Sequence, residues 1–141
     1  MKLEKEFPNV DACNPRQCIS GKMMRCNRIV ANVFRKHLKP FNITDSQLST
    51  LFIVTKAENV TQKTLSDMMF MEKSTVNRNL KRLIENDYIT KLGVHELQTT
   101  NKGLQLLERV IPHWENAMTE IRTLLDEEGE TAINTLLQKL I

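Results

Sequence analysis

The sequence predicts a mainly α-helical fold with one small β-hairpin. Gly and Pro number only four each in 141 residues, which is too few for the many turns of an all-β protein. Apolar residues recur at spacings of three and four along most of the chain, as they do on the buried face of a helix. A chain of this length makes one domain, and its 40% hydrophobic and 26% charged residues are an ordinary globular balance.

The N-terminal part is predicted to hold an arm and then a long helix. Residues 1–16 are interpreted as a loosely held, flexible arm. The residues that interrupt regular structure there are Pro8, Asn9, Asn14 and Pro15. A helix is expected over about residues 17–39, ending before Pro40 because proline disfavours helical backbone in the residue that precedes it. Its apolar stripe is formed by Met23, Cys26, Val30, Val33, Phe34 and His37.

Three shorter helices are predicted in the middle of the chain. A capping box opens the first, because the Thr44 hydroxyl can accept a backbone N–H while Gln47 reaches back. The second starts near Thr61 and the third near Glu72, whose carboxylate is expected to help cap it. The third should end around Asn86, a residue type that takes the left-handed conformation at helix ends. Its buried face comprises Val76, Leu80, Leu83 and Ile84.

A hairpin and a long helix complete the pattern. Residues 88–92 and 94–99 contain β-branched and aromatic residues and flank Gly93, which predicts two short strands and a turn. A heptad-like apolar seam then indicates a helix that packs lengthwise on another helix. The seam is Leu104, Leu107, Ile111, Trp114, Met118, Ile121 and Leu125. We expect Pro112 to kink this helix and Gly129 to separate a last helix from it.

The order of these elements describes a winged helix-turn-helix with long helices at both chain ends. We expect an arm over residues 1–16 and a single domain over 17–141. Within that domain, the winged helix-turn-helix lobe covers about 44–100. The terminal helices, about 17–39 and 102–141, are then free to build a dimer.

Charge is unevenly distributed along the chain. Residues 1–43 carry nine Lys/Arg against three Asp/Glu, whereas residues 102–141 carry four against seven. A basic front and an acidic end suit a protein that faces a polyanion with one side. On charge alone an ordinary solvated surface explains the pattern equally well. Aromatic residues are only 5% of the chain, which argues against a base-stacking platform for single strands.

The helix that begins near Glu72 is the candidate for reading DNA, because an α-helix fits the major groove and its N-terminal residues reach base edges. Its polar residues are Lys73, Ser74, Thr75, Asn77, Arg78, Lys81 and Arg82. Asn and Arg form paired hydrogen bonds with adenine and guanine. The preceding short helix offers an N-terminus that attracts phosphate, with Thr61, Gln62 and Lys63. The alternative is a solvated amphipathic helix, which the neighbouring capped helix and hairpin disfavour.

The same segment carries a family resemblance. Residues 71–89, with Lys73-Ser74-Thr75-Val76 and the following Arg78, resemble the recognition helix and first wing strand of MarR-family regulators. Residues 43–51 resemble the second helix of that family, and residues 97–103 resemble its entry to the fifth helix. The resemblance extends over about residues 17–141.

The resemblance implies a homodimeric regulator of transcription that binds double-stranded DNA at a pseudo-palindromic operator. A repressor released by a small ligand or by cysteine oxidation is the expectation. Each recognition helix would enter one major groove, and the terminal helices would form the dimer. No Ser-His-Asp, Cys-His or paired-carboxylate arrangement stands out, and Gly is too scarce for a phosphate-cradling loop, so we expect no enzyme and no cofactor.

The predicted wing departs from the family pattern. It is several residues shorter, and residues 91–98 contain neither the Arg nor the Asp that family wings commonly carry. Only Lys91 and His95 remain there for DNA contact, so readout of the minor groove is in doubt. This motivates an alternative of another class, a winged-helix protein-interaction module with weak or no DNA binding.

Three cysteines, Cys13, Cys18 and Cys26, lie in the N-terminal part. Their spacing does not fit the common zinc pairs, so no metal site is predicted. Peroxide-sensing relatives carry a reactive Cys near the start of the first helix, about where Cys18 lies, but the Tyr partners of that Cys are missing here. Ordinary structural cysteines are therefore the stronger interpretation, and a redox role for Cys18 is the second.

Some family members respond to small aromatic anions in a crevice beside the dimer helices. Arg25, Arg28 and His37 are the candidates for such an effector site, and a solvated helix face is the simpler alternative. No apolar run approaches the roughly 20 residues of a membrane span, and no secretory signal is visible. We therefore expect a cytoplasmic protein without membrane contact.

Overall fold

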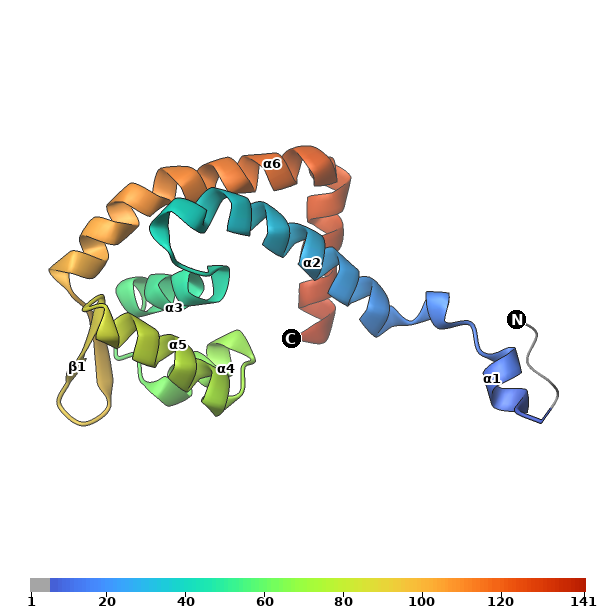
Figure 1. Cartoon of the computed structure of the whole chain (residues 1–141), viewed down its shortest axis with the longest axis horizontal. Coiled ribbons are helices and arrows are strands. Elements are labelled where there is room, and N and C mark those ends of the chain that lie inside the picture. The colour runs from blue at the N-terminus through green and yellow to red at the C-terminus, as the bar shows by residue number, and fades with distance from the viewer. Residues whose placement is uncertain (1–5) are drawn as a thin grey trace. The chain divides into compact units, whose positions relative to one another are not determined.

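The computed structural model describes residues 6–141 (Figure 1). Six α-helices lie in this part: α1 (Pro8–Ala12), α2 (Ile19–Leu38), α3 (Asp45–Lys56), α4 (Gln62–Met69), α5 (Lys73–Glu85) and α6 (Asn101–Leu140). The 3-10 turns η1 (Pro15–Gln17) and η2 (Lys39–Phe41) flank α2, and strands β1 (Ile89–Leu92) and β2 (Glu96–Thr99) form a hairpin. The predicted fold class, mainly α with a small hairpin, is confirmed. The first five residues of the predicted arm lie outside the described residues.

The described part of the chain divides into two compact units, one that ends at Asn32 and one that covers residues 33–141. The first unit holds α1, η1 and the start of α2. Pro8 and Pro15 were expected to interrupt structure here, but each begins a short helix, α1 and η1. Proline suits this position because the first helical N–H needs no partner within the helix. The Asn14 side chain accepts a hydrogen bond from the backbone N–H of Arg16 and so caps η1.

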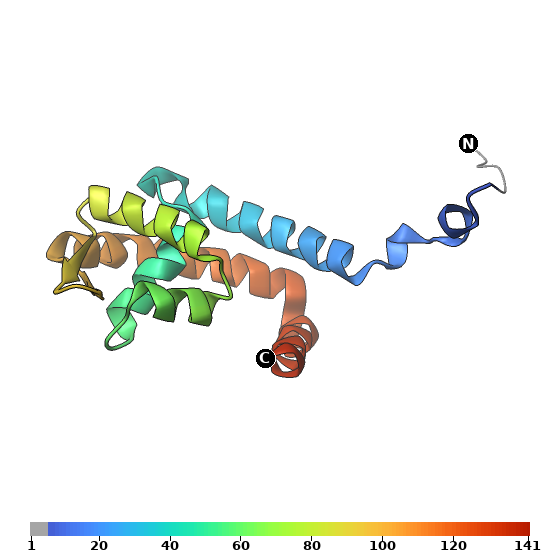
Figure 2. The same cartoon turned by 90° about the horizontal axis from the view of Figure 1, so that it is seen from below.

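The second unit has one apolar core. Helices α3, α4 and α5 gather beneath α6 in the view of Figure 1, with the hairpin beside the first turn of α6; Figure 2 shows the same arrangement from below. The most deeply buried side chains come from every one of these elements. They include Leu48, Leu51, Leu65, Val76, Leu83, Ile89, Leu106 and Val110. The helix-turn-helix lobe is therefore packed directly onto the long C-terminal helix.

Side-chain caps fix where three of these helices begin. The predicted capping box is confirmed, since Thr44 Oγ1 accepts from Gln47 N at 3.1 Å and Gln47 Oε1 accepts from Thr44 N at 3.2 Å. Thr61 caps α4 by accepting from the backbone N–H of Thr64, and Thr100 caps α6 by accepting from that of Gly103. The expectation for Glu72 was wrong: it occupies the N-cap position of α5, but its side chain makes no capping hydrogen bond.

The hairpin pairs Ile89 with Thr99 through to Leu92 with Glu96 in antiparallel register, and Gly93 takes a positive φ of 62° in its turn. The left-handed residue after α5 is Asp87, with φ 62°, rather than the expected Asn86. The backbone N–H of Leu97 also donates to the carbonyl of Val60, 2.9 Å away. This third rung, which the sequence pattern does not reveal, ties the start of α4 to the wing.

Helix α6 differs from its prediction in two respects. Its non-helical residue is Asp126 (φ 56°), not Gly129, and Pro112, where a kink is predicted, lies inside the helix. Asp126 Oδ1 accepts from Gly129 N, as an N-cap residue does for the turn that follows. The expected seam is buried in part: Leu107 and Ile121 are buried, whereas Leu104 is 45% exposed and the buried residues also include Leu106, Val110 and Ala117. A strict heptad drifts around a straight helix of 3.6 residues per turn, so only part of the seam faces the lobe.

Within residues 6–141, the structure contains no helix of sufficient length and apolar character to cross a membrane.

Gly103, in the first turn of α6, permits a close backbone approach. A Cβ at this position would lie 2.3 Å from the carbonyl oxygen of Tyr88 and 2.7 Å from Thr99 Cγ2. We expect Gly103→Ala to lower the free energy of unfolding by roughly 1–3 kcal/mol, because the hairpin must shift to make room. Chemical denaturation measures this change.

Gly21→Ala is the matched control. The nearest atom to a Cβ there would be an ordinary 3.6 Å away, and Ala has the higher helix propensity. This variant should be as stable as the parent chain or slightly more stable. A Gly103→Ala protein of unchanged stability would show that the contact with Tyr88 is not tight.

Candidate nucleic-acid interface

The N-terminus of α4 presents three of the residues predicted to contact DNA. Thr61 is the N-cap, and its Oγ1 accepts from the backbone N–H of Thr64 at 3.1 Å. Gln62 is half-buried, whereas Lys63 is exposed and pairs with Asp67 across one turn, at 3.3 Å. Because Leu65 is completely buried, the helix cannot rotate, and these polar residues stay on the outside.

Helix α5 is oriented by one buried face and one polar anchor. Val76, Leu80 and Leu83 point into the core. On the flank of the helix, Asn79 Nδ2 donates to Ser46 Oγ on α3, 2.7 Å away. The side chain of Asn79 also lies 3.8 Å from Met71 Sδ. These contacts fix the rotation of α5 and leave its remaining faces to solvent.

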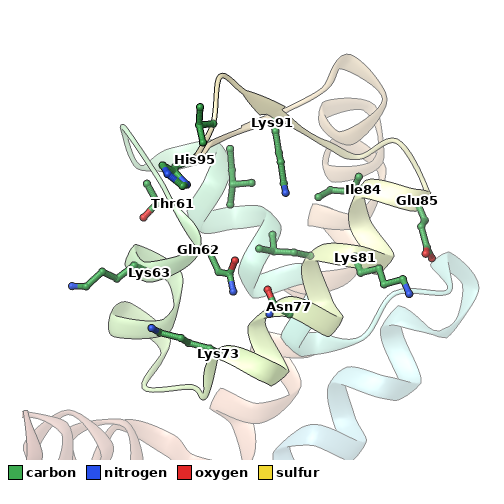
Figure 3. A pocket seen from close by; sticks show the side chains of 13 residues that line it. Thr61, Gln62, Lys63, Lys73, Asn77, Lys81, Ile84, Glu85, Lys91 and His95 are labelled. Atoms are coloured by element: carbon green, nitrogen blue, oxygen red, sulfur yellow. The ribbon is translucent and has the colours of Figure 1, made fainter.

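A groove of about 820 Å³ lies between α4, α5 and the hairpin (Figure 3). It brings together many of the residues that the sequence singled out from three separate segments. From α4 and its cap come Thr61, Gln62 and Lys63; from α5 come Lys73, Asn77 and Lys81; and from the wing come Lys91 and His95. In Figure 3 the Lys91 side chain extends from the hairpin toward α5. A concave, lysine-rimmed surface of this kind can accept a polyanion.

The other predicted residues of α5 lie outside this groove. Ser74, Arg78 and Arg82 are spaced four apart and form an exposed stripe on the adjoining face of the helix. Thr75 is half-buried, and its Oγ1 accepts a hydrogen bond from the Arg78 guanidinium at 3.2 Å. The structure therefore divides the predicted contacts of α5 into a groove-facing set and an outward-facing set.

Sequence reasoning missed the apolar wall of the groove and its acidic residue. Leu80, Ile84, Val94 and Leu97 line it together with Glu85. Val94, at the turn of the hairpin, is 80% exposed. The sequence could have predicted that Val94 is exposed, because this residue follows Gly93 in a hairpin turn. It could not predict that Leu97 lines the groove, because that depends on how the hairpin packs against α4 and α5.

The candidate redox residue Cys18 lies immediately before α2 and is exposed, as are Cys13 and Cys26. Its Sγ accepts a hydrogen bond from the backbone N–H of Gly21, 3.4 Å away. In residues 6–141, no group of three or more His, Cys, Asp or Glu side chains is placed to hold a metal ion.

The candidate effector residues fall into different units. Arg25 and Arg28 are exposed on the first part of α2, and His37 is half-buried on its last turn. His37 Nε2 lies 3.7 Å from Glu120 Oε1 on α6 and has no hydrogen-bond partner among the described residues. Lys36 Nζ lies 2.5 Å from the same carboxylate oxygen. An effector role for these residues stays a prediction.

Comparison with known proteins agrees with this geometry. Residues 41–96, which span α3 to the start of β2, match the sequence profile of the MarR family. This likeness covers the winged-helix segment alone, less than half of the chain. Among curated proteins, the chain is similar to the uncharacterized HTH-type transcriptional regulator YwoH of Bacillus subtilis, with 33% identity over 64 residues. That match covers 45% of this chain and 47% of YwoH, so it spans about half the length of the relative.

Solved structures of transcriptional regulators share the fold over most of the chain. The M. tuberculosis transcriptional regulator MosR has a TM-score of 0.79 at 22% identity, covering 89% of this chain and 97% of MosR. A second structure, of MosR in complex with DNA, has a TM-score of 0.74 at 22% identity, covering 87% and 97%. The reduced form of E. coli MarR has a TM-score of 0.71 at 18% identity, covering 88% and 93%. At these identities the likeness concerns the fold. The matched family is one of regulators, which agrees with the expectation that the chain is not an enzyme.

The ion pair between α2 and α6 gives a pH-dependent prediction. The hydrogen bond from Lys36, aided by the charges of Lys36 and His37, holds the pKa of Glu120 below its ordinary value of 4.5. A carboxylate with a lowered pKa stabilises the fold at pH values above its unfolded pKa, and this stabilisation is lost as the pH falls through the folded pKa. We therefore expect Glu120→Gln to lower Tm slightly at neutral pH and to have no effect at pH values well below 4.5.

Thermal unfolding followed by circular dichroism at both pH values measures this difference. Glu115→Gln, which removes an exposed carboxylate from the same helix, is the control and should leave Tm unchanged. An effect of Glu120→Gln that persists undiminished in acid would contradict the role given to the ion pair.

Proposed function

We propose that this chain is a transcriptional regulator that binds double-stranded DNA through α5, the N-terminus of α4 and the hairpin. The observation that carries the proposal is the groove that Lys63, Lys73, Lys81 and Lys91 line from these three segments. The fold shared with MosR, a regulator with a structure in complex with DNA, supports it. Contacts with phosphates supply most of the affinity for DNA. Several lysines around one groove therefore contribute more to the affinity than any single contact does.

The two polar stripes of α5 suggest a division of roles. The outward stripe with Ser74 and Arg78, together with Asn77, has the side-chain types that read base edges in the major groove. The Thr75 hydroxyl that accepts from Arg78 holds this guanidinium before DNA arrives. Residues farther along α5 or on the hairpin are better placed to contact phosphates. They are Lys81, Arg82, Lys91 and His95. Thr61, Gln62 and Lys63 would place one phosphate at the N-terminus of α4.

We infer that the active form is a homodimer built by the terminal helices. The segment of α6 after Asp126 exposes an apolar set that includes Ile133, Leu136, Leu137 and Leu140. A dimer would present two α5 helices to successive major grooves of a pseudo-palindromic operator, with centres about 34–36 Å apart. A repressor that a bound effector or an oxidised cysteine releases from DNA would work by changing this separation.

The DNA-binding proposal is tested by titrating the duplex that flanks the chain's own gene, at two salt concentrations. Binding should weaken steeply with salt, with a log–log slope of about 0.9 per neutralised phosphate. Arg78→Ala should lower the specific affinity by about 1–3 kcal/mol and leave the affinity for random duplex nearly unchanged. Lys81→Ala is the matched control, because loss of a phosphate contact weakens binding to both duplexes equally.

A second candidate function is a winged-helix protein-interaction module without DNA binding. The observation that favours it is the short hairpin, whose turn offers the exposed Val94 in place of a basic residue. Absence of salt-dependent binding to any duplex would favour this candidate over the first.

Oxidative control is tested at Cys18, whose thiol is exposed at the start of α2. If the residue is a sensor, peroxide treatment should modify Cys18 before Cys13 and Cys26, as read by mass spectrometry, and should weaken DNA binding. Unmodified Cys18, or equal modification of the three exposed thiols, would remove the redox proposal.

A further inference from the structure

The turn between α4 and α5 displays a bulky aromatic residue in an unfavourable backbone conformation. Phe70 has φ 51° and is 76% exposed, and the nearby Met68 is 51% exposed. Glycine is the usual residue at this left-handed C-cap, because any side chain strains the backbone there. The phenyl ring gains little packing within the chain in return. We call Met68 and Phe70 the apolar knob.

The backbone around the knob is held in place. Phe70 N and Met71 N both donate to the carbonyl of Ser66, and Ser66 Oγ donates back to the carbonyl of Met71 at 2.6 Å. Asn79, itself anchored to α3, lies against the Met71 sulfur. The knob is therefore presented in a fixed position, which lowers the entropic cost of inserting it into a partner.

Two carboxylates flank the knob, at Asp67 and Glu72. Asp67 already pairs with Lys63. Glu72 is exposed, and in the part of the chain that the structure describes its side chain makes neither a capping hydrogen bond nor an ion pair within 4.0 Å. A surface that fits the knob should thus offer an apolar pocket with a basic rim.

The groove between α4, α5 and the wing has these properties. Its walls include Leu80, Ile84, Val94 and Leu97, its rim carries four lysines, and its volume of about 820 Å³ is ample for a phenyl ring (Figure 3). We propose that the apolar knob of one copy of this chain docks into the groove of a second copy. The occupant is another copy because the knob is apolar with acidic residues beside it, and the groove has apolar walls with lysines on its rim.

This contact would be reciprocal and would compete with DNA. Lys73, on the groove rim, follows Phe70 by only three residues, so knob and groove are near each other on one copy and two copies can exchange knobs about a twofold axis. The consequence for regulation rests on the proposed DNA-binding function: a groove filled by Phe70 is closed to a duplex. At high protein concentration the regulator would then self-associate into an assembly that does not bind DNA.

Phe70→Gly tests the proposal, because glycine accepts the left-handed conformation and the variant should fold with an unchanged or higher Tm. Sedimentation velocity over a range of protein concentrations, without DNA, should show an assembly that forms by doubling of the basal species. Phe70→Gly should weaken this doubling by about tenfold or more, the effect expected of an interface hot spot. Glu72→Gln should weaken it less and reduce its dependence on salt.

Asn42→Gly is the matched control, since it replaces another left-handed, exposed residue, with φ 50°, without removing an apolar side chain. It should assemble like the parent chain. Adding a duplex to the parent chain should dissociate the doubled species. At low protein concentration, Phe70→Gly should bind that duplex as tightly as the parent chain does.

Any of these sedimentation results would overturn the proposal: no doubling in the parent chain at any concentration, doubling unaffected by Phe70→Gly, or doubling that persists on saturating DNA. Loss of DNA affinity in Phe70→Gly at low concentration would overturn it too, by showing that the ring contacts DNA. Failure of the parent chain to bind any duplex would refute the proposed function instead, and the sedimentation result would still decide whether the knob docks.

Discussion

The burial of one face of α5 is the constraint on which the rest of the structure depends. Val76, Leu80 and Leu83 are at most 5% exposed, and each buried aliphatic side chain is worth roughly 1.5–3 kcal/mol. The exposed polar contacts of the same helix, such as the hydrogen bond between Arg78 and Thr75, are worth about 1 kcal/mol or less. The apolar face therefore decides the rotation of the helix, and the polar faces follow from it.

This rotation gives the two polar stripes of α5 different surroundings. Lys73, Asn77 and Lys81 border the groove with α4 and the wing, whereas Ser74, Arg78 and Arg82 face outward. The pairing of Val60 with Leu97 ties the start of α4 to the wing, so the two outer walls of the groove are held by one hydrogen bond as well as by the core. A surface with such preset geometry binds with little reorganisation.

The sequence predicted those features that are encoded locally. The capping box at Thr44 and the apolar spacing of α5 need no knowledge of the tertiary fold, and both are present. The same spacing rule, applied to α6, identified the helix and part of its buried face, Leu107 and Ile121, but not Leu106 or Val110, because that face is chosen by the lobe that packs against it. The break at Asp126 was placed three residues late, at Gly129, since glycine is the more obvious helix breaker by composition.

The candidate site was predictable residue by residue but not as a surface. Lysines from three segments were singled out separately, and only the fold shows that they share one groove. Its apolar wall escaped notice because Leu80 and Ile84 were expected to serve only as the buried face of α5. Phe70 gave a weak signal, a bulky residue at a helix end that favours glycine, and its exposure is a tertiary property.

Amide hydrogen exchange of the chain with and without a cognate duplex tests the central claim most directly. If α5 is oriented as described, the amides of residues 61–64, 73–82 and 91–95 should gain protection together when the duplex binds. The amides of α6 after Asp126 should show no change in protection. Protection confined to the terminal helices, or absent from residues 73–82, would contradict the orientation of α5 and the interface built on it.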